Sequence, residues 1–223
     1  FFMVDLTLAI INKTKEVSMK KTNPPDIIIG RLPLYLRALH RMADTGSLVT
    51  SSQELGEWVG ISAAQIRKDI SQFGEFGKQG TGYNIDFLSK KLREIMNIDR
   101  VWDVAIIGAG DIGHGLARYQ GFLDRGFRVA LAFDIDPEKI GTKIGDVVVE
   151  DISKMVVSIN DADVKIAMIA VPADNAQDVA EKLVKAGVKA ILNYATIIIN
   201  VPEDVRVQYI DPATHLQWMT YYL

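Results

Sequence analysis

The chain contains no cysteine and only three histidines among its 223 residues. Disulfide bonds, thiol nucleophiles and cysteine-ligated metals are therefore excluded, and three scattered histidines give little support for a metal site. No apolar run reaches the roughly 18 to 20 residues that a membrane-spanning helix needs. Residues 1–18 lack the basic and small-residue features of a signal peptide, and we treat them as a leader or extension without a role in the fold. We predict a cytoplasmic protein with no membrane partner and no bound metal.

Charge of either sign is moderate, but it is unevenly distributed. Residues 1–100 carry 14 lysines and arginines against 11 acidic residues, whereas residues 101–223 carry 11 against 17. A mildly basic half can face a polyanion, although chance variation is the alternative explanation. Hydrophobic periodicity divides the chain at the same place, because residues 31–96 read as helices and residues 103–210 alternate strands with helices. These patterns predict a domain boundary near residues 97–103.

Two helix starts lie close together in the first half. Ser51 with Glu54, and Ser62 with Gln65, have the spacing of capping boxes, and Gly60 ends the first of the two helices. Only two residues, Gly60 and Ile61, separate the end of one helix from the cap of the next. The sequence therefore predicts two helices that meet across a tight turn, as in a helix-turn-helix.

The second of these helices has a small, polar and basic outer face. At about 100° per residue, its apolar positions gather on one side and Ala64, Arg67, Lys68 and Ser71 on the other. Small side chains let a helix enter the major groove, and cationic or amide side chains reach base edges and phosphates. The glycine-rich segment 74–83 then suits a hairpin that acts as a wing. The residues predicted to contact DNA are Ser62, Ala64, Gln65, Arg67, Lys68, Ser71, Lys78, Gln79 and Thr81. A generic helical domain with a solvated basic face is the alternative.

The second half opens with a dinucleotide-binding fingerprint. Gly108, Gly110 and Gly113 form the pattern G-x-G-x-x-G between a predicted strand, 103–107, and a helical run, 114–125. The first glycine permits a tight turn, the second lets a pyrophosphate approach the backbone, and the third lets helix and strand pack closely. Free N–H groups at the helix start then bind phosphate.

Asp134 ends the next predicted strand, 21 residues beyond the last glycine of the fingerprint. At this position a carboxylate can accept hydrogen bonds from the adenosine ribose, although a helix-capping or turn role is the alternative. A 2′-phosphate would face Asp134 and Asp136 with no cation before Lys139. The sequence therefore favours NAD over NADP.

Further strands, 164–171 and 189–193, alternate with helices and predict a mostly parallel sheet covered on both faces. Ligands bind such sheets beyond the carboxyl ends of the strands, so the loops after these strands should lie near the nicotinamide. The alternatives without a binding role are that Pro172 only ends a strand and that Tyr194 only packs against its neighbours. The residues predicted to contact the nucleotide are Gly108, Ala109, Gly110, Asp111, Ile112, Gly113, Asp134, Ile135, Val171, Pro172, Ala173, Asn193, Tyr194 and Ala195.

No catalytic residue is predicted. A dehydrogenase needs a substrate pocket and an acid or base near the nicotinamide, and the helical half leaves no room for a substrate domain. His114 lies at the helix start by the pyrophosphate, and His215 has no evident carboxylate partner. We predict binding without turnover. The alternatives are a small NAD-dependent oxidoreductase with an appended helical domain, and a nucleotide-binding scaffold whose basic helix contacts an acidic protein.

The C-terminal segment 211–223 is strongly aromatic and predicts a helix that is apolar around most of its circumference. Such a helix must bury its apolar side chains against another surface. The sequence leaves open whether this surface is the chain's own sheet or a second subunit. Asp211 at its start is a candidate partner for Arg31 or Arg37, with N-capping as the more ordinary role.

Together these motifs resemble the Rex family of bacterial redox-sensing transcriptional repressors, from Arg31 to Leu223. The resemblance is carried by Arg31-Leu32-Pro33-Leu34-Tyr35, Ile66-Arg67-Lys68-Asp69, Phe73-Gly74-Glu75-Phe76-Gly77-Lys78-Gln79-Gly80-Thr81-Gly82-Tyr83, the glycine fingerprint, Tyr119-Gln120-Gly121-Phe122 and Tyr221-Tyr222-Leu223.

The resemblance implies a homodimer that binds palindromic operator DNA and is released by NADH, with NADH and NAD+ as sensed ligands. It implies a winged-helix DNA-binding domain over 19–98, a Rossmann NAD(H)-binding domain over 99–210, and a C-terminal helix over 211–223 that is exchanged between subunits. Two residues depart from the family pattern: Thr196 stands where a proline is usual, and His114 where an arginine is often found. These departures bear on ligand affinity.

Overall fold

The computed structural model describes residues 24–77 and 81–223, and the chain divides between Asn97 and Ile98 into two compact units. Lys78 and Gln79, both predicted DNA contacts, lie outside the described residues, as does the leader segment 1–18. Within the described residues, no helix is long and apolar enough to cross a membrane.

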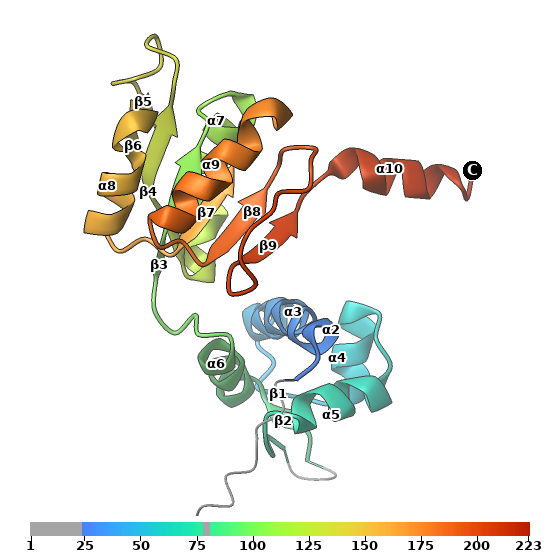
Figure 1. Cartoon of the computed structure of the whole chain (residues 1–223). Helices are drawn as coiled ribbons and strands as arrows, with labels where there is room; N and C mark the ends of the chain where they lie inside the picture. Colours follow the sequence, from blue (N-terminus) through green and yellow to red (C-terminus); the bar gives the residue numbers. More distant parts are fainter. Residues whose placement is uncertain (1–23, 78–80) are drawn as a thin grey trace, which may run out of the picture. The chain divides into compact units, whose positions relative to one another are not determined.

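The first unit consists of short helices and a two-stranded antiparallel ribbon (Figure 1). Its elements are α2 (Asp26–Ile29), α3 (Leu32–Asp44), β1 (Val49–Thr50), α4 (Ser52–Val59), α5 (Ala63–Ser71), β2 (Tyr83–Asn84) and α6 (Ile85–Ile95). The core is formed by fully buried side chains from α3, α4, α5 and α6. These include Leu32, Tyr35, Leu39, Leu55, Ile66, Leu88 and Leu92.

The helix-turn-helix forms where the caps predict it. Ser51 and Glu54 make a complete capping box, and Gly60 ends α4 in the left-handed conformation with φ of 71°. Ser62 caps α5 by accepting a hydrogen bond from the Gln65 backbone N–H, so only half of the second predicted box is formed. The Gln65 side chain is engaged elsewhere, as described below.

The glycine-rich segment 74–83, the expected hairpin, is described except for residues 78–80. Among its described residues only Tyr83 belongs to a strand, and Tyr83 pairs with Thr50, which precedes the helix-turn-helix. Gly77 nevertheless lies close to the returning chain, because a Cβ there would approach the Gly82 carbonyl and the Tyr83 ring. The two described ends of the segment thus lie close together, and its predicted tip, residues 78–80, lies outside the described residues.

The second unit is a seven-stranded sheet in the order β5-β6-β4-β3-β7-β8-β9, parallel except for the β5–β6 pair. The strands are β3 (Trp102–Ile107), β4 (Phe127–Asp134), β5 (Lys143–Ile144), β6 (Val147–Asp151), β7 (Ile166–Ile169), β8 (Ala190–Asn193) and β9 (Arg206–Tyr209). The helices are α7 (Asp111–Ala117), η1 (Gln120–Arg125), η2 (Ile152–Lys154), α8 (Met155–Asp161), α9 (Ala173–Lys185) and α10 (Pro212–Thr220). This confirms the predicted mixed fold, a helical N-terminal unit followed by a Rossmann-type sheet.

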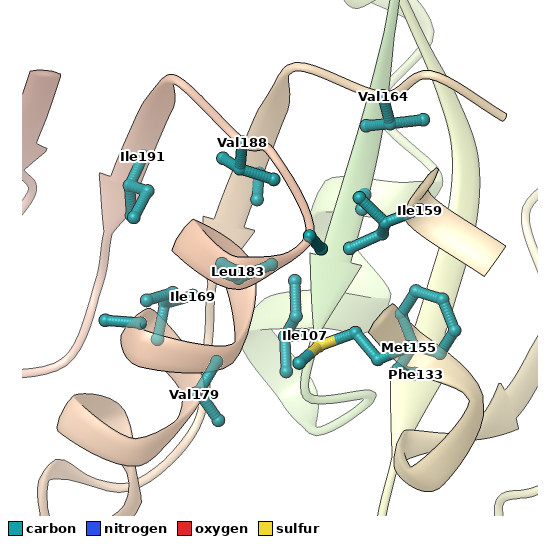
Figure 2. Packing of buried hydrophobic residues seen from close by; sticks show 14 of the residues in the cluster. Ile107, Phe133, Met155, Ile159, Val164, Ile169, Val179, Leu183, Val188 and Ile191 are labelled. Carbon is teal, nitrogen blue, oxygen red and sulfur yellow. The ribbon is translucent and has the colours of Figure 1, made fainter. Parts of the chain in front are cut away.

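Helices cover both faces of the sheet, as the alternation along β3 shows. Ala105 and Ile107 pack into the large core under α8 and α9, where Phe133 and Leu183 also lie (Figure 2). Val104 and Ile106 point to the opposite face, where side chains of α7 and η1 cover them. The central strand is therefore buried on both sides, which accounts for its continuous apolar sequence.

The helical run predicted over 114–125 is interrupted. Helix α7 ends at Ala117, Tyr119 adopts an extended conformation, and a 3₁₀ helix follows. The Tyr119 ring stacks edge-on against Phe122, with ring centroids 5.0 Å apart, and a Cβ on Gly121 would overlap that ring. The chain thus leaves the α-helix after Ala117, and the Tyr119 ring packs against Phe122 and Gly121.

Candidate nucleotide-binding and DNA-binding sites

The three glycines of the fingerprint differ in what surrounds them. A Cβ on Gly113 would overlap the Gly108 carbonyl oxygen, and one on Gly108 would press on the Ala170 backbone. Gly108 also has φ of 101°, which favours glycine. A Cβ on Gly110, by contrast, would meet nothing within 4 Å. The protein itself therefore requires the first and third glycines, whereas the second borders open space that a ligand can occupy.

Asp134 is buried at the end of β4 and holds the glycine loop in place. Its Oδ2 accepts a hydrogen bond of 2.7 Å from the Ala109 N–H, and its Oδ1 accepts one of 2.9 Å from the Asp136 N–H. Burial raises the pKa of the Asp134 carboxyl, but these backbone hydrogen bonds and the charge of Lys139 outweigh it and lower the pKa overall. Both oxygens have protein partners, so the ribose contact stays a prediction.

Lys139 lies closer to the acidic pair than the sequence argument assumed. Its Nζ is 3.5 Å from Asp134 Oδ2 and 3.6 Å from Asp136 Oδ2. The sequence indicated no cation near Asp134 and Asp136, but Lys139 compensates part of their negative charge. The turn after β4 brings Lys139 close to the two carboxylates. In this turn the Lys139 N–H donates a hydrogen bond to the Asp136 carbonyl.

The ends of β3, β7 and β8 meet at one edge of the sheet, as predicted from their parallel order. Ile107 pairs with Ile169, and Ile169 pairs with Asn193, so the loops after these strands are neighbours. Asn193 is fully buried and bonds its own loop, accepting from the Ala195 N–H at 2.9 Å and donating to the Ile197 carbonyl at 3.0 Å. Its side chain shapes the loop, and its contact with the nucleotide stays a prediction. Burial raises the pKa of the Tyr194 hydroxyl.

The remaining predicted nucleotide contacts lie around this edge. Ile112 and Ile135 are exposed, with 51% and 76% of their surface accessible, and offer apolar surface beside the glycine loop and beyond β4. Pro172 forms the N-cap of α9, and Ala173 is that helix's first residue. No group of three or more histidine, cysteine or acidic residues within residues 24–77 and 81–223 is arranged to hold a metal ion.

Helix α5 presents the outer face that the sequence predicts. Its predicted contact residues Ala64, Arg67, Lys68 and Ser71 are exposed, as are the cap Ser62 and the more distant Thr81. Arg67 Nη1 donates a hydrogen bond of 2.8 Å to Ser52 Oγ in α4, so the two helices share a polar contact at this surface. Gln65 differs from the others because it is half-buried.

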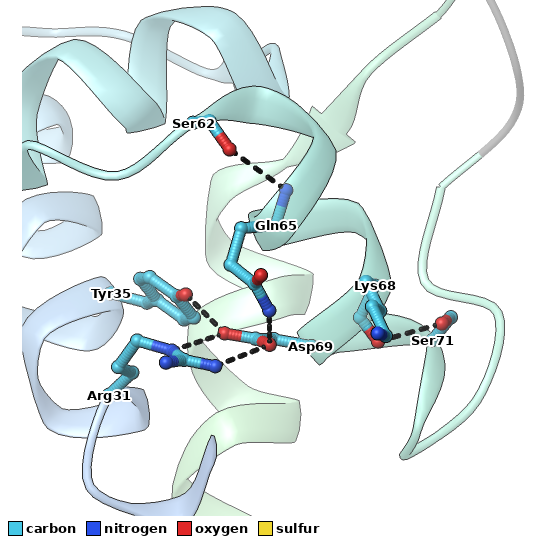
Figure 3. A network of polar contacts seen from close by, with 7 residues as sticks. All are labelled: Arg31, Tyr35, Ser62, Gln65, Lys68, Asp69 and Ser71. Carbon is cyan, nitrogen blue, oxygen red and sulfur yellow. Dashed lines mark hydrogen bonds and ion pairs between the residues drawn. The ribbon is translucent and has the colours of Figure 1, made fainter. Parts of the chain in front are cut away.

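The inner side of α5 carries a polar network that sequence reasoning missed (Figure 3). Asp69 is fully buried and forms a two-pronged ion pair with Arg31, at 2.6 Å to Nε and 2.8 Å to Nη2. The Tyr35 hydroxyl donates to it at 2.6 Å, and Gln65 Nε2 donates at 2.7 Å. Burial alone raises the pKa of the Asp69 carboxyl, but these donors together lower it below its ordinary value. Burial, followed by the hydrogen bond to Asp69, raises the pKa of Tyr35.

Asp211 takes the more ordinary of its two predicted roles. It N-caps α10, accepting from the Ala213 N–H at 2.9 Å and from Thr214 Oγ1 at 2.9 Å. Helix α10 buries none of its residues within the chain.

These observations define a class of protein: a DNA-binding regulator with a helix-turn-helix unit and a Rossmann-type nucleotide unit. Residues 25–71 match a family model described as "Putative DNA-binding protein N-terminus", and residues 99–197 match one described as "CoA binding domain". The particular family follows from the relatives that match nearly the whole chain.

The redox-sensing transcriptional repressor Rex of Chloroflexus aurantiacus is 51% identical over 90% of this chain and 94% of its own length. Rex of Brevibacillus brevis is 40% identical over 89% and 96%. Crystal structures of RSP, a Rex-family repressor, are also similar. The complex with β-NAD+ and operator DNA has a TM-score of 0.86 at 38% identity over 90% of this chain and 93% of that one. The complex with β-NADH has a TM-score of 0.82 at 36% identity over 90% and 94%.

The chain belongs to the Rex family of redox-sensing transcriptional repressors. It is therefore a transcriptional regulator, and the small oxidoreductase considered as an alternative is wrong.

Proposed function

We propose that this protein is a cytoplasmic repressor that binds palindromic operator DNA as a homodimer and leaves it when NADH binds. The observation that carries the proposal is the similarity to RSP over 90% of the chain, since RSP has been crystallised with β-NAD+ and operator DNA and, separately, with β-NADH. The exposed basic face of α5 and the open space beside Gly110 support the two binding activities.

The DNA contacts we propose are those of α5 and its cap, together with the segment 78–81. N-terminal residues of a recognition helix meet base edges, and cationic residues beside them meet phosphates. Ser62, Ala64 and Gln65 occupy the first group of positions, and Arg67 and Lys68 suit the second.

The nucleotide contacts we propose are the backbone of 108–113, Asp134 with Ile135, and the loops 171–173 and 193–195. The pyrophosphate would lie beside Gly110 at the start of α7, where free N–H groups point outward. The nicotinamide would then lie beyond the ends of β7 and β8.

The charge of the nicotinamide ring differs between NAD+ and NADH, and this difference would let the two nucleotides act differently. The oxidised nicotinamide ring is positive and the reduced ring is neutral, so an apolar pocket between subunits penalises NAD+ through desolvation. If NADH favours a closed dimer that no longer matches half-sites about one DNA turn apart, ligand and operator weaken each other by the same factor. A tenfold effect needs a differential of only about 1.4 kcal/mol.

Two variants separate the two binding activities. We expect Arg67→Ala to weaken duplex binding and to lower its salt dependence, without altering NADH affinity. We expect Asp134→Ala to weaken NADH binding, by about tenfold or more, and to leave binding to the duplex intact in the absence of nucleotide. Fluorescence anisotropy with a palindromic duplex selected in vitro, and NADH fluorescence, measure the two affinities. A wild-type protein that binds no selected duplex would refute the proposed function.

A further inference from the structure

Asp69 is saturated with hydrogen-bond donors. Its Oδ2 accepts from Arg31 Nε and the Tyr35 hydroxyl, and its Oδ1 accepts from Arg31 Nη2 and Gln65 Nε2. A carboxylate has about four acceptor directions, so each of them has a partner. Three of the four donors come from the start of α3, two from its N-cap residue Arg31 and one from Tyr35, and they fix the position of the carboxylate. The fourth donor, Gln65, lies on α5 itself, one turn before Asp69.

This arrangement determines which way the Gln65 amide faces. An ionised carboxylate accepts hydrogen bonds only, so Gln65 must turn its nitrogen towards Asp69 and its oxygen away. Figure 3 shows the amide oxygen on the side opposite Asp69. The main chain of Gln65 is held as well, because its N–H donates to Ser62 Oγ at 3.3 Å. Among residues 24–77 and 81–223 no donor is bonded to Gln65 Oε1.

We propose that Asp69 is a positioning residue which fixes Gln65 so that its Oε1 accepts a hydrogen bond from a base in the major groove. The base read by Gln65 is then adenine or cytosine. This inference rests on the proposed function and adds to it the chemistry of one base contact.

The choice of base follows from the groups at the major-groove edge. Adenine presents the N6 amino group and cytosine the N4 amino group, and both are donors to a fixed acceptor. Guanine presents O6 and N7 and thymine presents O4, so both would place an oxygen or nitrogen lone pair against Gln65 Oε1. The second N–H of the Gln65 amide can also donate to adenine N7, which gives adenine two bonds.

The position of Gln65 suits this role. It is the third residue of α5, and base contacts in helix-turn-helix proteins come from the N-terminal residues of the recognition helix. The exposed cations Arg67 and Lys68 can only donate, so they match guanine or phosphate. Gln65 supplies an acceptor of fixed direction among these donors.

The test begins with selection of duplexes from a randomised palindromic pool by the wild-type protein. Affinities for all four base pairs at each half-site position then give a discrimination profile. We expect one position at which adenine or cytosine is preferred about tenfold and at which Gln65→Met reduces the preference to less than about twofold. Gln65→Met keeps the side-chain length, and Arg31 and Tyr35 still donate three hydrogen bonds to Asp69. Gln72→Met, at the exposed C-terminal end of the same helix, is the matched control and should leave the profile unchanged.

Asp69→Asn tests the positioning role. An amide at position 69 can donate as well as accept, so Gln65 is free to turn over. We expect discrimination to fall at the Gln65 position only, and to show no additional change when Asp69→Asn is added to Gln65→Met. If Asp69 only holds the fold, affinities for all duplexes fall together and the profile persists, which overturns the proposal. If Asp69→Asn does not fold, removal of the base amino group decides: the wild-type protein should lose about tenfold in affinity for a duplex in which purine replaces that adenine, or 2-pyrimidinone that cytosine, and an unchanged affinity is incompatible with a fixed acceptor.

The outcomes separate this inference from the proposed function. A wild-type protein that selects no duplex contradicts the repressor itself. A wild-type protein that selects a duplex, together with an unchanged profile in Gln65→Met, overturns only the role of Gln65 and Asp69.

Discussion

Two buried carboxylates, one in each unit, hold the segments that we propose meet a ligand. Asp69 ties α5 to the N-cap residue of α3, and Asp134 ties the glycine loop to the end of β4. Each has a pKa lowered by hydrogen bonds that outweigh the effect of burial. A buried charge of this kind is stabilised by the groups that donate hydrogen bonds to it. We therefore expect the removal of a single donor to lower the free energy of unfolding measurably.

Tyr35→Phe removes one donor from Asp69 and changes little else, since the ring stays in the core. We expect a loss of about 1 to 3 kcal/mol in the free energy of unfolding, because the hydrogen bond is to a charged acceptor. Urea unfolding followed by circular dichroism measures it. Tyr83→Phe is the control, because no described residue is bonded to the Tyr83 hydroxyl. Equal stability of Tyr35→Phe and wild type would show that this hydrogen bond contributes nothing.

The lowered pKa of Asp69 makes a prediction about pH. A carboxyl whose folded pKa lies below its unfolded value stabilises the fold fully above about pH 4, and this contribution is lost as the pH falls through the folded pKa. We therefore expect the stability of the wild-type protein to fall more steeply below pH 4 than that of a folded Asp69→Asn variant. Urea midpoints between pH 7 and pH 3 test it. Parallel curves would contradict the assignment.

At the scale of elements, the glycine loop contains one glycine that the fold requires and one that borders open space. Gly113→Ala places a methyl group against the Gly108 carbonyl, so we expect it to destabilise the second unit, by about 1 to 3 kcal/mol. Gly110→Ala meets nothing within 4 Å, so it should fold like wild type and still lose NADH binding by about tenfold or more. Thermal unfolding and NADH titration of both variants make the comparison. Normal NADH binding by Gly110→Ala would place the pyrophosphate elsewhere.

Local signals predicted most of these elements, and contacts between distant residues account for what they missed. The capping residues located the helix-turn-helix, and the period of α5 located its outer face, because both depend on neighbours within one or two turns. The Arg31–Asp69 pair joins residues 38 apart, and the pairing of Thr50 with Tyr83 involves strands of two residues each. Strands that short leave no periodicity to read. The break at Tyr119 likewise depends on how one ring packs.

In the site as well, local spacing predicted some features, and features that depend on loop paths were missed. The glycine fingerprint and the carboxylate at the end of β4 could be located from spacing, because the turn geometry of this motif is fixed by its backbone. The inward use of Asn193 and the return of Lys139 to Asp134 could not, because both depend on the course of a loop.

At the scale of the whole molecule, α10 carries apolar surface that this chain does not cover. Leu216, Trp218 and Met219 are each more than half exposed, as are the three residues that end the chain. If this helix is exchanged between subunits, as the family resemblance implies, deletion of residues 212–223 converts the proposed dimer to a monomer. Sedimentation velocity compares the two proteins, with circular dichroism as a check that the shortened chain folds. An unchanged sedimentation coefficient would mean that the dimer, if present, is held by other surfaces.

The proposed antagonism between NADH and operator is tested most directly by a competition experiment on the full chain. The protein is bound to a selected, fluorescently labelled palindromic duplex, and anisotropy is followed during separate titrations with NADH and NAD+. We expect release by NADH at concentrations at least about tenfold lower than any effect of NAD+, which corresponds to about 1.4 kcal/mol. Release by both nucleotides at the same concentration, or by neither, would contradict it.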